Sequence, residues 1–182
     1  YMGEAMALAH EGVALVDIDK AAEKFGMPMG PIELADSVGL DIAQHVAAIL
    51  TTAKPREVPD NDLASLVEAG NLGRKSGQGY YKWEDGKAVK PPASGQPVPD
   101  DIEDRLILPM VNEAVACLAE GVVTEADLLD AGVIFGTGFA PFRGGPINYA
   151  RQRGFEAVQA ALQTLSERHG DRFNPHAGWS DL

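Results

Sequence analysis

The stretch FGMPMGPIELADSVGLD, residues 25–41, decides how this chain is expected to fold. Sequence typical of helices lies on both sides of it, yet Gly26, Pro28, Gly30 and Pro31 interrupt the chain in quick succession. A plain turn needs one Gly or one Pro, and a phosphate loop uses glycines without prolines because its backbone N–H groups bind the anion. The segment therefore predicts a rigid break between two helices, with Pro31 opening the second.

Apolar residues recur at helical spacing through most of the chain. The segments with this pattern are 1–12, 17–26, 31–53, 60–73, 100–121, 124–136, 147–154 and 155–170. Paired aromatics and a turn signal in GYYKWEDGK, residues 79–87, predict one short extended stretch. Because no run of alternating strands appears, the expected fold class is all-α.

The two halves of the chain resemble each other. Glu4-Ala5 and Glu11-Gly12-Val13 recur 109 positions later as Glu113-Ala114 and Glu120-Gly121-Val122. Each copy continues with a short acidic helix (Asp19 or Asp127), a Phe-Gly pair, and a break that ends in Gly-Pro. A tandem duplication explains this better than chance. We expect a first repeat at 1–84, a Pro- and Gly-rich linker at 85–99, and a second repeat at 100–182.

Charge and composition narrow the function classes. The net charge of −12 argues against nucleic acid and anionic membrane surfaces as partners. No apolar run reaches membrane-spanning length, and the single cysteine, Cys117, suits a reducing compartment, so a cytoplasmic location is expected. The chain opens at Tyr1, without Met and inside a helical pattern, which suggests a piece of a longer protein.

No catalytic constellation is visible. GNLGRKSGQG, residues 70–79, fails as a P-loop because Arg74 separates Gly73 from Lys75 and no strand precedes it. The G-x-G of GTGFAPFRGG, residues 136–145, lacks the strand and helix of a dinucleotide fingerprint. The four histidines have no metal-ligand spacing. We therefore predict no catalytic, cofactor-binding or metal-binding residue in this chain.

Two long motifs carry a family resemblance. Residues 25–41, followed by LVEAGNLGRKSGQGYYKW at 66–83, resemble the C-terminal region of 3-hydroxyacyl-CoA dehydrogenases. PMVNEAVACLAEGV (109–122), FGTGFAPFRGGP (135–146) and HGDRFNP (169–175) are similar to the last repeat of the multifunctional α subunit of the fatty acid oxidation complex. The resemblance covers nearly the whole chain. It implies a tandem duplicated helical domain of the 6-phosphogluconate dehydrogenase C-terminal type.

The resemblance also implies a division of labour. The complete enzyme would have an enoyl-CoA hydratase part, an NAD-binding Rossmann domain and then this region. It would oxidise L-3-hydroxyacyl-CoA to 3-ketoacyl-CoA in fatty acid β-oxidation. The catalytic His–Glu pair and a substrate-polarising Asn would lie upstream of Tyr1, so this chain alone is expected to be inactive. The implied partners are the acyl-CoA substrate, the protein's own N-terminal domains and a thiolase β subunit.

The implied substrate-binding residues are Met27, Pro28, Gly30, Pro31, Phe135 and Lys75. By the resemblance, the break forms a wall facing the acyl thioester, and its apolar side chains suit an acyl chain. The alternative is that these residues only pack helices together. Phe135 takes the place of a substrate-contacting Tyr and lacks its hydroxyl. Lys75, with Arg74, is a candidate for a CoA phosphate, although the sequence favours a solvated basic pair.

Two rival hypotheses stay open. One is a stand-alone helical dimerisation or scaffold module without a ligand, which the opening at Tyr1 disfavours. The other is the helical half of a different β-hydroxyacid dehydrogenase. It fits the fold but not the pair of motifs GMPMGP and GRKSGQGYY. The preferred acyl-chain length and the oligomeric state are not determined by the sequence.

Overall fold

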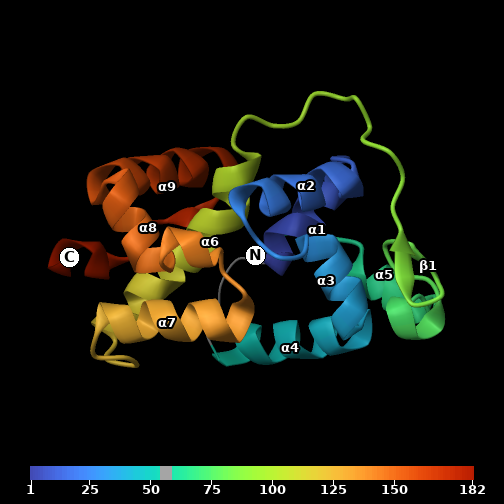
Figure 1. Ribbon diagram of the computed structural model, residues 1–182, viewed down its shortest axis with the longest axis horizontal. Coiled ribbons are helices and arrows are strands. Elements are labelled where there is room, and N and C mark those ends of the chain that lie inside the picture. The colour runs from blue at the N-terminus through green and yellow to red at the C-terminus, as the bar shows by residue number, and fades with distance from the viewer. Residues whose placement is uncertain (54–58) are drawn as a thin grey trace. The chain divides into compact units, whose positions relative to one another are not determined.

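The prediction of an all-α fold is confirmed. The structure is a computed structural model that describes residues 1–53 and 59–182 (Figure 1). Its α-helices are α1 Met2–His10, α2 Leu15–Phe25, α3 Pro31–Val38, α4 Leu40–Ala53, α5 Leu63–Glu68, α6 Ile102–Ala119, α7 Ala126–Thr137, α8 Pro146–Arg153 and α9 Phe155–His169. Short 3-10 turns lie at Arg74–Ser76, Pro141–Arg143, Asp171–Phe173 and Ala177–Asp181. Within the described ranges, no helix is long and apolar enough to span a bilayer.

The predicted extended stretch forms one β-hairpin. Strand β1 (Lys82–Glu84) pairs antiparallel with β2 (Lys87–Val89), and Trp83 lies opposite Ala88. Asp85 and Gly86 make the tight turn, and both have positive φ. Strand β2 therefore lies inside the segment 85–99 that the sequence suggested as a linker.

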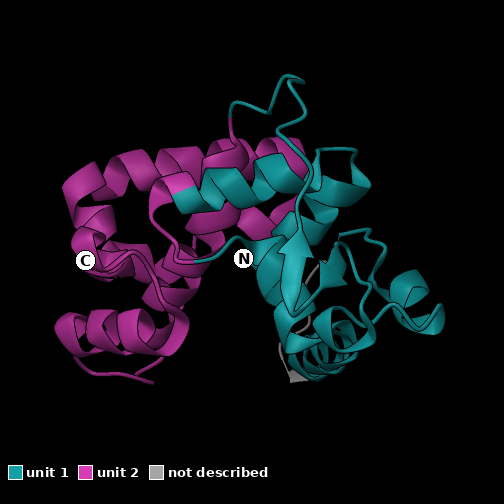
Figure 2. Ribbon diagram, turned by 45° about the vertical axis from the view of Figure 1, so that its right-hand side comes forward, with its two compact units in different colours: residues 1–23, 29–100 teal, residues 24–28, 101–182 magenta. Residues whose placement is uncertain are grey.

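The chain divides into two compact units (Figure 2). Unit 1 holds residues 1–23 and 29–100, and unit 2 holds residues 24–28 and 101–182. The first part of the early Gly/Pro break thus belongs to the unit that is otherwise built from the second half of the sequence.

Unit 1 is built around α3, which packs on α1 and α4. One cluster of its buried core comprises Met6, Ala35, Leu40, Ala43 and Leu63. The hairpin is tied to this core by Asp36, whose side chain is fully buried. Its carboxylate accepts hydrogen bonds from the Tyr80 N–H (2.9 Å), the Tyr81 N–H (2.8 Å) and the Trp83 indole (3.0 Å). Three donors compensate the cost of burying that charge.

Unit 2 is built around the long helix α6, which packs on α7, α8 and α9. Pro109 lies inside α6, and the helix continues through it. The C-terminal turn is fixed to α6 by Asn112, whose side-chain oxygen accepts from the His176 N–H (2.9 Å) and the Trp179 indole (2.8 Å).

The two units repeat one helix-capping device. Asp19 accepts from the backbone N–H groups of Ile32 (2.8 Å) and Glu33 (3.3 Å) at the start of α3. Asp130 does the same for Ile147 (2.7 Å) and Asn148 (2.9 Å) at the start of α8. Such carboxylates satisfy N–H groups that have no partner within the helix. Gly30 and Gly145 precede these helices, and a Cβ at either would overlap the capping Asp side chain.

This geometry corrects one sequence correspondence. Asp130, and not Asp127, is the counterpart of Asp19. Asp127 lies exposed in the first turn of α7. The capping carboxylate lies 13 positions before its main N–H partner in the first copy and 17 positions before it in the second. The stretch from the capping Asp to the helix it caps is therefore four residues longer in the second copy, and a fixed sequence offset cannot align the two copies.

Candidate functional site

The early break is anchored in unit 2 by Phe25. Its ring is fully buried and packs edge-on against Phe139 (centroids 5.5 Å apart) and Tyr149 (5.2 Å). Edge-to-face packing of aromatic rings is favourable beyond the apolar area it buries. This cluster explains why residues 24–28 belong to unit 2.

The second break lies directly against the first within unit 2. Gly26 has φ of +120°, and a Cβ there would lie 2.5 Å from two ring carbons of Phe142. A Cβ at Gly138 would lie 2.9 Å from Cγ of Pro28. Both glycines thus allow an approach that any side chain would block.

Arg143 joins the two breaks. Its Nε donates a hydrogen bond to the Phe25 carbonyl at 2.8 Å. Its guanidinium carbon lies 4.0 Å from the centroid of the Phe25 ring and 5.4 Å from those of Phe142 and Tyr149. The Arg143 carbonyl in turn accepts from the Asn148 side chain at 2.8 Å. We call Gly138, Phe142 and Arg143 the clamp, because each of them contacts residues 25–28.

The predicted site residues of the break differ in exposure. Met27 is only 5% exposed, and Gly30 and Pro31 are buried in unit 1. Pro28 is exposed, and Phe135, near the end of α7, is 89% exposed. Pro28 and Phe135 therefore offer open apolar surface, whereas the other three residues occupy packing positions.

Lys75 is held by a carboxylate. Its Nζ lies 2.5 and 2.6 Å from the two carboxylate oxygens of Asp41, and about half of its side chain is exposed. The Lys75 ammonium holds the pKa of the Asp41 carboxyl below its ordinary value. A phosphate at this position would compete with Asp41 for the ammonium. The guanidinium carbon of Arg74 lies 6.0 Å from the centroid of the Trp83 ring, so Arg74 and Lys75 contact different groups.

Lys90 forms an ionic cluster that the sequence did not indicate. Its Nζ lies 2.7 Å from Glu33, 3.1 Å from Glu23 and 3.3 Å from Asp19. The Tyr81 hydroxyl donates to Asp19 at 2.9 Å. Lys90 lies in a Pro-rich segment without periodicity, so no local pattern pointed to these contacts.

Burial and charge oppose each other in this cluster. Burial raises the pKa of the Asp19 carboxyl, and the Ile32 N–H and Lys90 ammonium offset only part of that rise. Burial alone would lower the pKa of Lys90, but its carboxylate neighbours outweigh that effect and raise it. Burial and the nearby Asp19 also raise the pKa of the Tyr81 hydroxyl. The cluster ties the segment after β2 to α2 and α3.

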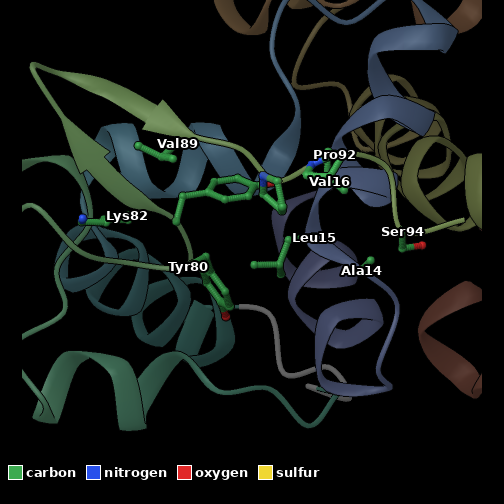
Figure 3. A pocket seen from close by; sticks show the side chains of 10 residues that line it. Ala14, Leu15, Val16, Tyr80, Lys82, Val89, Pro92 and Ser94 are labelled. Atoms are coloured by element: carbon green, nitrogen blue, oxygen red, sulfur yellow. The ribbon is translucent and has the colours of Figure 1, made fainter. Parts of the chain in front are cut away.

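A pocket of about 340 Å³ lies within unit 1 (Figure 3). Its walls are the start of α2, the hairpin and the segment that follows β2, and they include Leu15, Val16, Tyr80, Val89 and Pro92. Such a volume is at the lower end of small-molecule sites. None of the six predicted site residues lines this pocket. Among the residues that the structure describes, no group of His, Cys, Asp or Glu side chains could hold a metal ion.

Comparison with known families identifies a relative of the first half of the chain. Residues 1–83 match the family described as 3-hydroxyacyl-CoA dehydrogenase, C-terminal domain. The fatty acid oxidation complex subunit alpha of Idiomarina loihiensis is 36% identical over 96% of this chain. The subunit of the same name from Shewanella amazonensis is also 36% identical, over 97% of the chain. The chain spans only about a quarter of the length of these relatives, 26% and 27%.

Solved structures share the fold. The 3-hydroxybutyryl-CoA dehydrogenase of Escherichia coli K12 superposes with a TM-score of 0.82 at 22% identity, covering all of this chain and 57% of that one. The dehydrogenase part of multifunctional enzyme 1 from C. elegans gives a TM-score of 0.67 at 23% identity, covering 93% of this chain and 42% of that one. At these identities the likeness concerns the fold alone.

Proposed function

We propose that this chain, whose residues 1–83 match the C-terminal domain of 3-hydroxyacyl-CoA dehydrogenases, is the substrate-enclosing region of such an enzyme in fatty acid β-oxidation. The observation that carries the proposal is the 36% identity to fatty acid oxidation complex α subunits over 96% of the chain, which spans both units. The full-length protein would then be a bifunctional enoyl-CoA hydratase and L-3-hydroxyacyl-CoA dehydrogenase. Its repeats would occupy residues 1–84 and 100–182, joined by 85–99.

The proposed substrate is an acyl-CoA thioester enclosed beside the two Gly/Pro breaks. Pro28 and Phe135 supply the exposed apolar surface that an acyl chain contacts. Met27 is buried in unit 2, and Gly30 and Pro31 are buried in unit 1, so each is proposed to support the substrate site by packing within its own unit. Lys75 binds a CoA phosphate when its ammonium group leaves the Asp41 carboxylate and pairs with the phosphate.

NAD, on which the family depends, is proposed to bind to the nucleotide-binding domain of the full-length protein. Dinucleotide sites use a strand, a Gly-rich turn and the N-terminus of the following helix. In residues 1–53 and 59–182 the only strands are those of the hairpin, and neither leads through a Gly-rich turn into a helix. The described strands therefore offer no Rossmann-type turn for the cofactor, which supports placing the NAD site in the nucleotide-binding domain. The proposed contribution of this chain is to bind the substrate, orient it and exclude water.

The proposed protein partners are the N-terminal domains of the same chain and a thiolase β subunit. An apolar stripe on and beside α4 supports the first of these. Each of its side chains is 45% to 54% exposed: Val38, Ile42, Val46, Ile49 and Leu50. Contiguous exposed apolar surface of this kind marks an interface in a folded protein. A cytoplasmic location is also proposed, on the basis of the similarity to fatty acid oxidation complex α subunits.

NADH-dependent reduction of acetoacetyl-CoA tests the proposal. The assay is run on residues 1–182 and on the full-length product of the same gene. Activity in the full-length protein and none in the shorter chain is the expected result. Absence of activity in both would exclude the dehydrogenase and favour a scaffold module. Activity in residues 1–182 alone would contradict the proposed division of labour.

A further inference from the structure

We infer that Arg143 is a positioning residue for substrate binding, because it fixes the break of the first repeat from within the break of the second. The inference rests on the proposed function, since it assigns to residues 25–28 a wall of the acyl-CoA site. The sequence did not suggest this role for Arg143, because the repeat pattern indicates two independent copies of one turn.

Gly26 gives the backbone of the break conformational freedom. This residue has φ of +120°, and a glycine populates several backbone conformations of similar energy. Without an external anchor, the direction of Met27 and Pro28 would vary. The Phe25 ring is fixed by its buried cluster, but its carbonyl, which begins the peptide unit leading into Gly26, needs a separate constraint.

Arg143 supplies that constraint. Its Nε donates to the Phe25 carbonyl at 2.8 Å while its guanidinium carbon lies 4.0 Å from the centroid of the Phe25 ring. One side chain thus fixes both the ring and the carbonyl of the residue before Gly26. A lysine can make a hydrogen bond or a cation–π contact, but it has no planar fork to make both in this geometry.

The rest of the clamp restricts the next residues. The Phe142 ring covers Gly26, and Gly138 leaves room for Pro28. Phe142 is 75% exposed, so core packing alone does not account for its position. The longer second break thereby serves as a support for the shorter first one.

Arg153 provides a matched control. It also lies in unit 2 and also contacts Tyr149, through a hydrogen bond to the hydroxyl at 3.1 Å. Its main partner is Asp104, at 2.5 and 2.8 Å, and both Asp104 and Tyr149 lie outside residues 25–28. Loss of Arg153 should affect stability without affecting the break.

The experiment uses the full-length protein with R143M, R143K, F142A and R153M. Substrates are acetoacetyl-CoA and a long-chain 3-ketoacyl-CoA, and amide hydrogen exchange is followed for residues 25–27, because Pro28 has no amide hydrogen. We expect R143M to raise KM for the long-chain substrate about tenfold with kcat within twofold, as loss of one hydrogen bond to a charged group would. R143K should recover part of the loss, and F142A should raise KM about threefold by loosening the cover of Gly26. Exchange in residues 25–27 should accelerate in R143M and not in R153M.

Unchanged KM and unchanged exchange in R143M would overturn the inference, as would an equal rise of KM in R153M. If R143M does not fold, F142A decides the question, because its side chain is mostly exposed and its removal leaves the core intact. A wild-type protein without dehydrogenase activity would refute the proposed function instead. In that case the exchange measurement would still show whether Arg143 orders the break.

Discussion

Removing the carboxylate of Asp130 tests the structural account of the second repeat most sharply. The substitution Asp130→Ala deletes the acceptor for two backbone N–H groups, those of Ile147 at 2.7 Å and Asn148 at 2.9 Å. The Asp130 residue is only 5% exposed, so water cannot simply replace the lost carboxylate. The start of α8 would therefore lose its cap in a buried setting.

The expected loss follows from these two hydrogen bonds. A lost N-cap costs about 0.5–2 kcal/mol, and a buried N–H left without an acceptor costs about 1–3 kcal/mol. Because these terms overlap, we expect D130A to lower the free energy of unfolding by about 3 kcal/mol. Urea denaturation followed by circular dichroism measures the change.

The control is Asp127→Ala, because Asp127 is the residue that the sequence repeat suggested as the counterpart of Asp19. Asp127 is exposed in the first turn of α7, where a carboxylate contributes about 0.3–1 kcal/mol through the helix dipole. A D130A loss below 1 kcal/mol, or an equal loss in both variants, would refute the capping assignment.

Three further predictions concern other sites. Gly26→Ala should destabilise the chain by about 1–2 kcal/mol because of its positive φ, whereas Gly3→Ala, with nothing within 4 Å, should not; denaturation of both decides. Lys90→Met leaves three carboxylates without their shared cation and should cost about 1–3 kcal/mol, with the loss shrinking in high salt. Burial would raise the pKa of Asp101, but contacts with His169 and neighbouring arginines outweigh it and lower that pKa. The stabilisation by ionised Asp101 is therefore complete above the ordinary pKa of about 3.9 and is lost as the pH falls through the folded-state pKa. The Tm of D101N should consequently vary less between pH 2 and 6 than that of the unsubstituted chain.

The sequence predicted the features that depend on local pattern. Helical spacing and the Gly/Pro breaks indicated an all-α fold, and the paired aromatics at Tyr80 and Tyr81 marked the one extended stretch. These predictions succeed because helix periodicity, Pro at a helix start and Gly at a turn act over a few residues.

Contacts between distant residues were not predictable in the same way. Asp130 was missed because the offset between the two copies is 109 at Glu120 but 111 at Asp130, which shifts the repeat register. Arg143 and Lys90 were missed because each acts on partners remote in sequence, Phe25 in one case and Asp19 in the other. Phe25 and Phe135 follow the same Phe-Gly pattern, yet one is fully buried and the other 89% exposed. A pair of residues alone does not define an environment.

The most direct test of the central claim is to remove residues 1–182 from the full-length protein and to measure NADH binding and acetoacetyl-CoA reduction separately. The truncated protein should bind NADH as before. Its reduction of acetoacetyl-CoA should fall at least about a hundredfold, because the substrate is no longer enclosed and oriented. A truncated enzyme that reduces acetoacetyl-CoA with unchanged KM and kcat would contradict the claim that these helices form part of the substrate site.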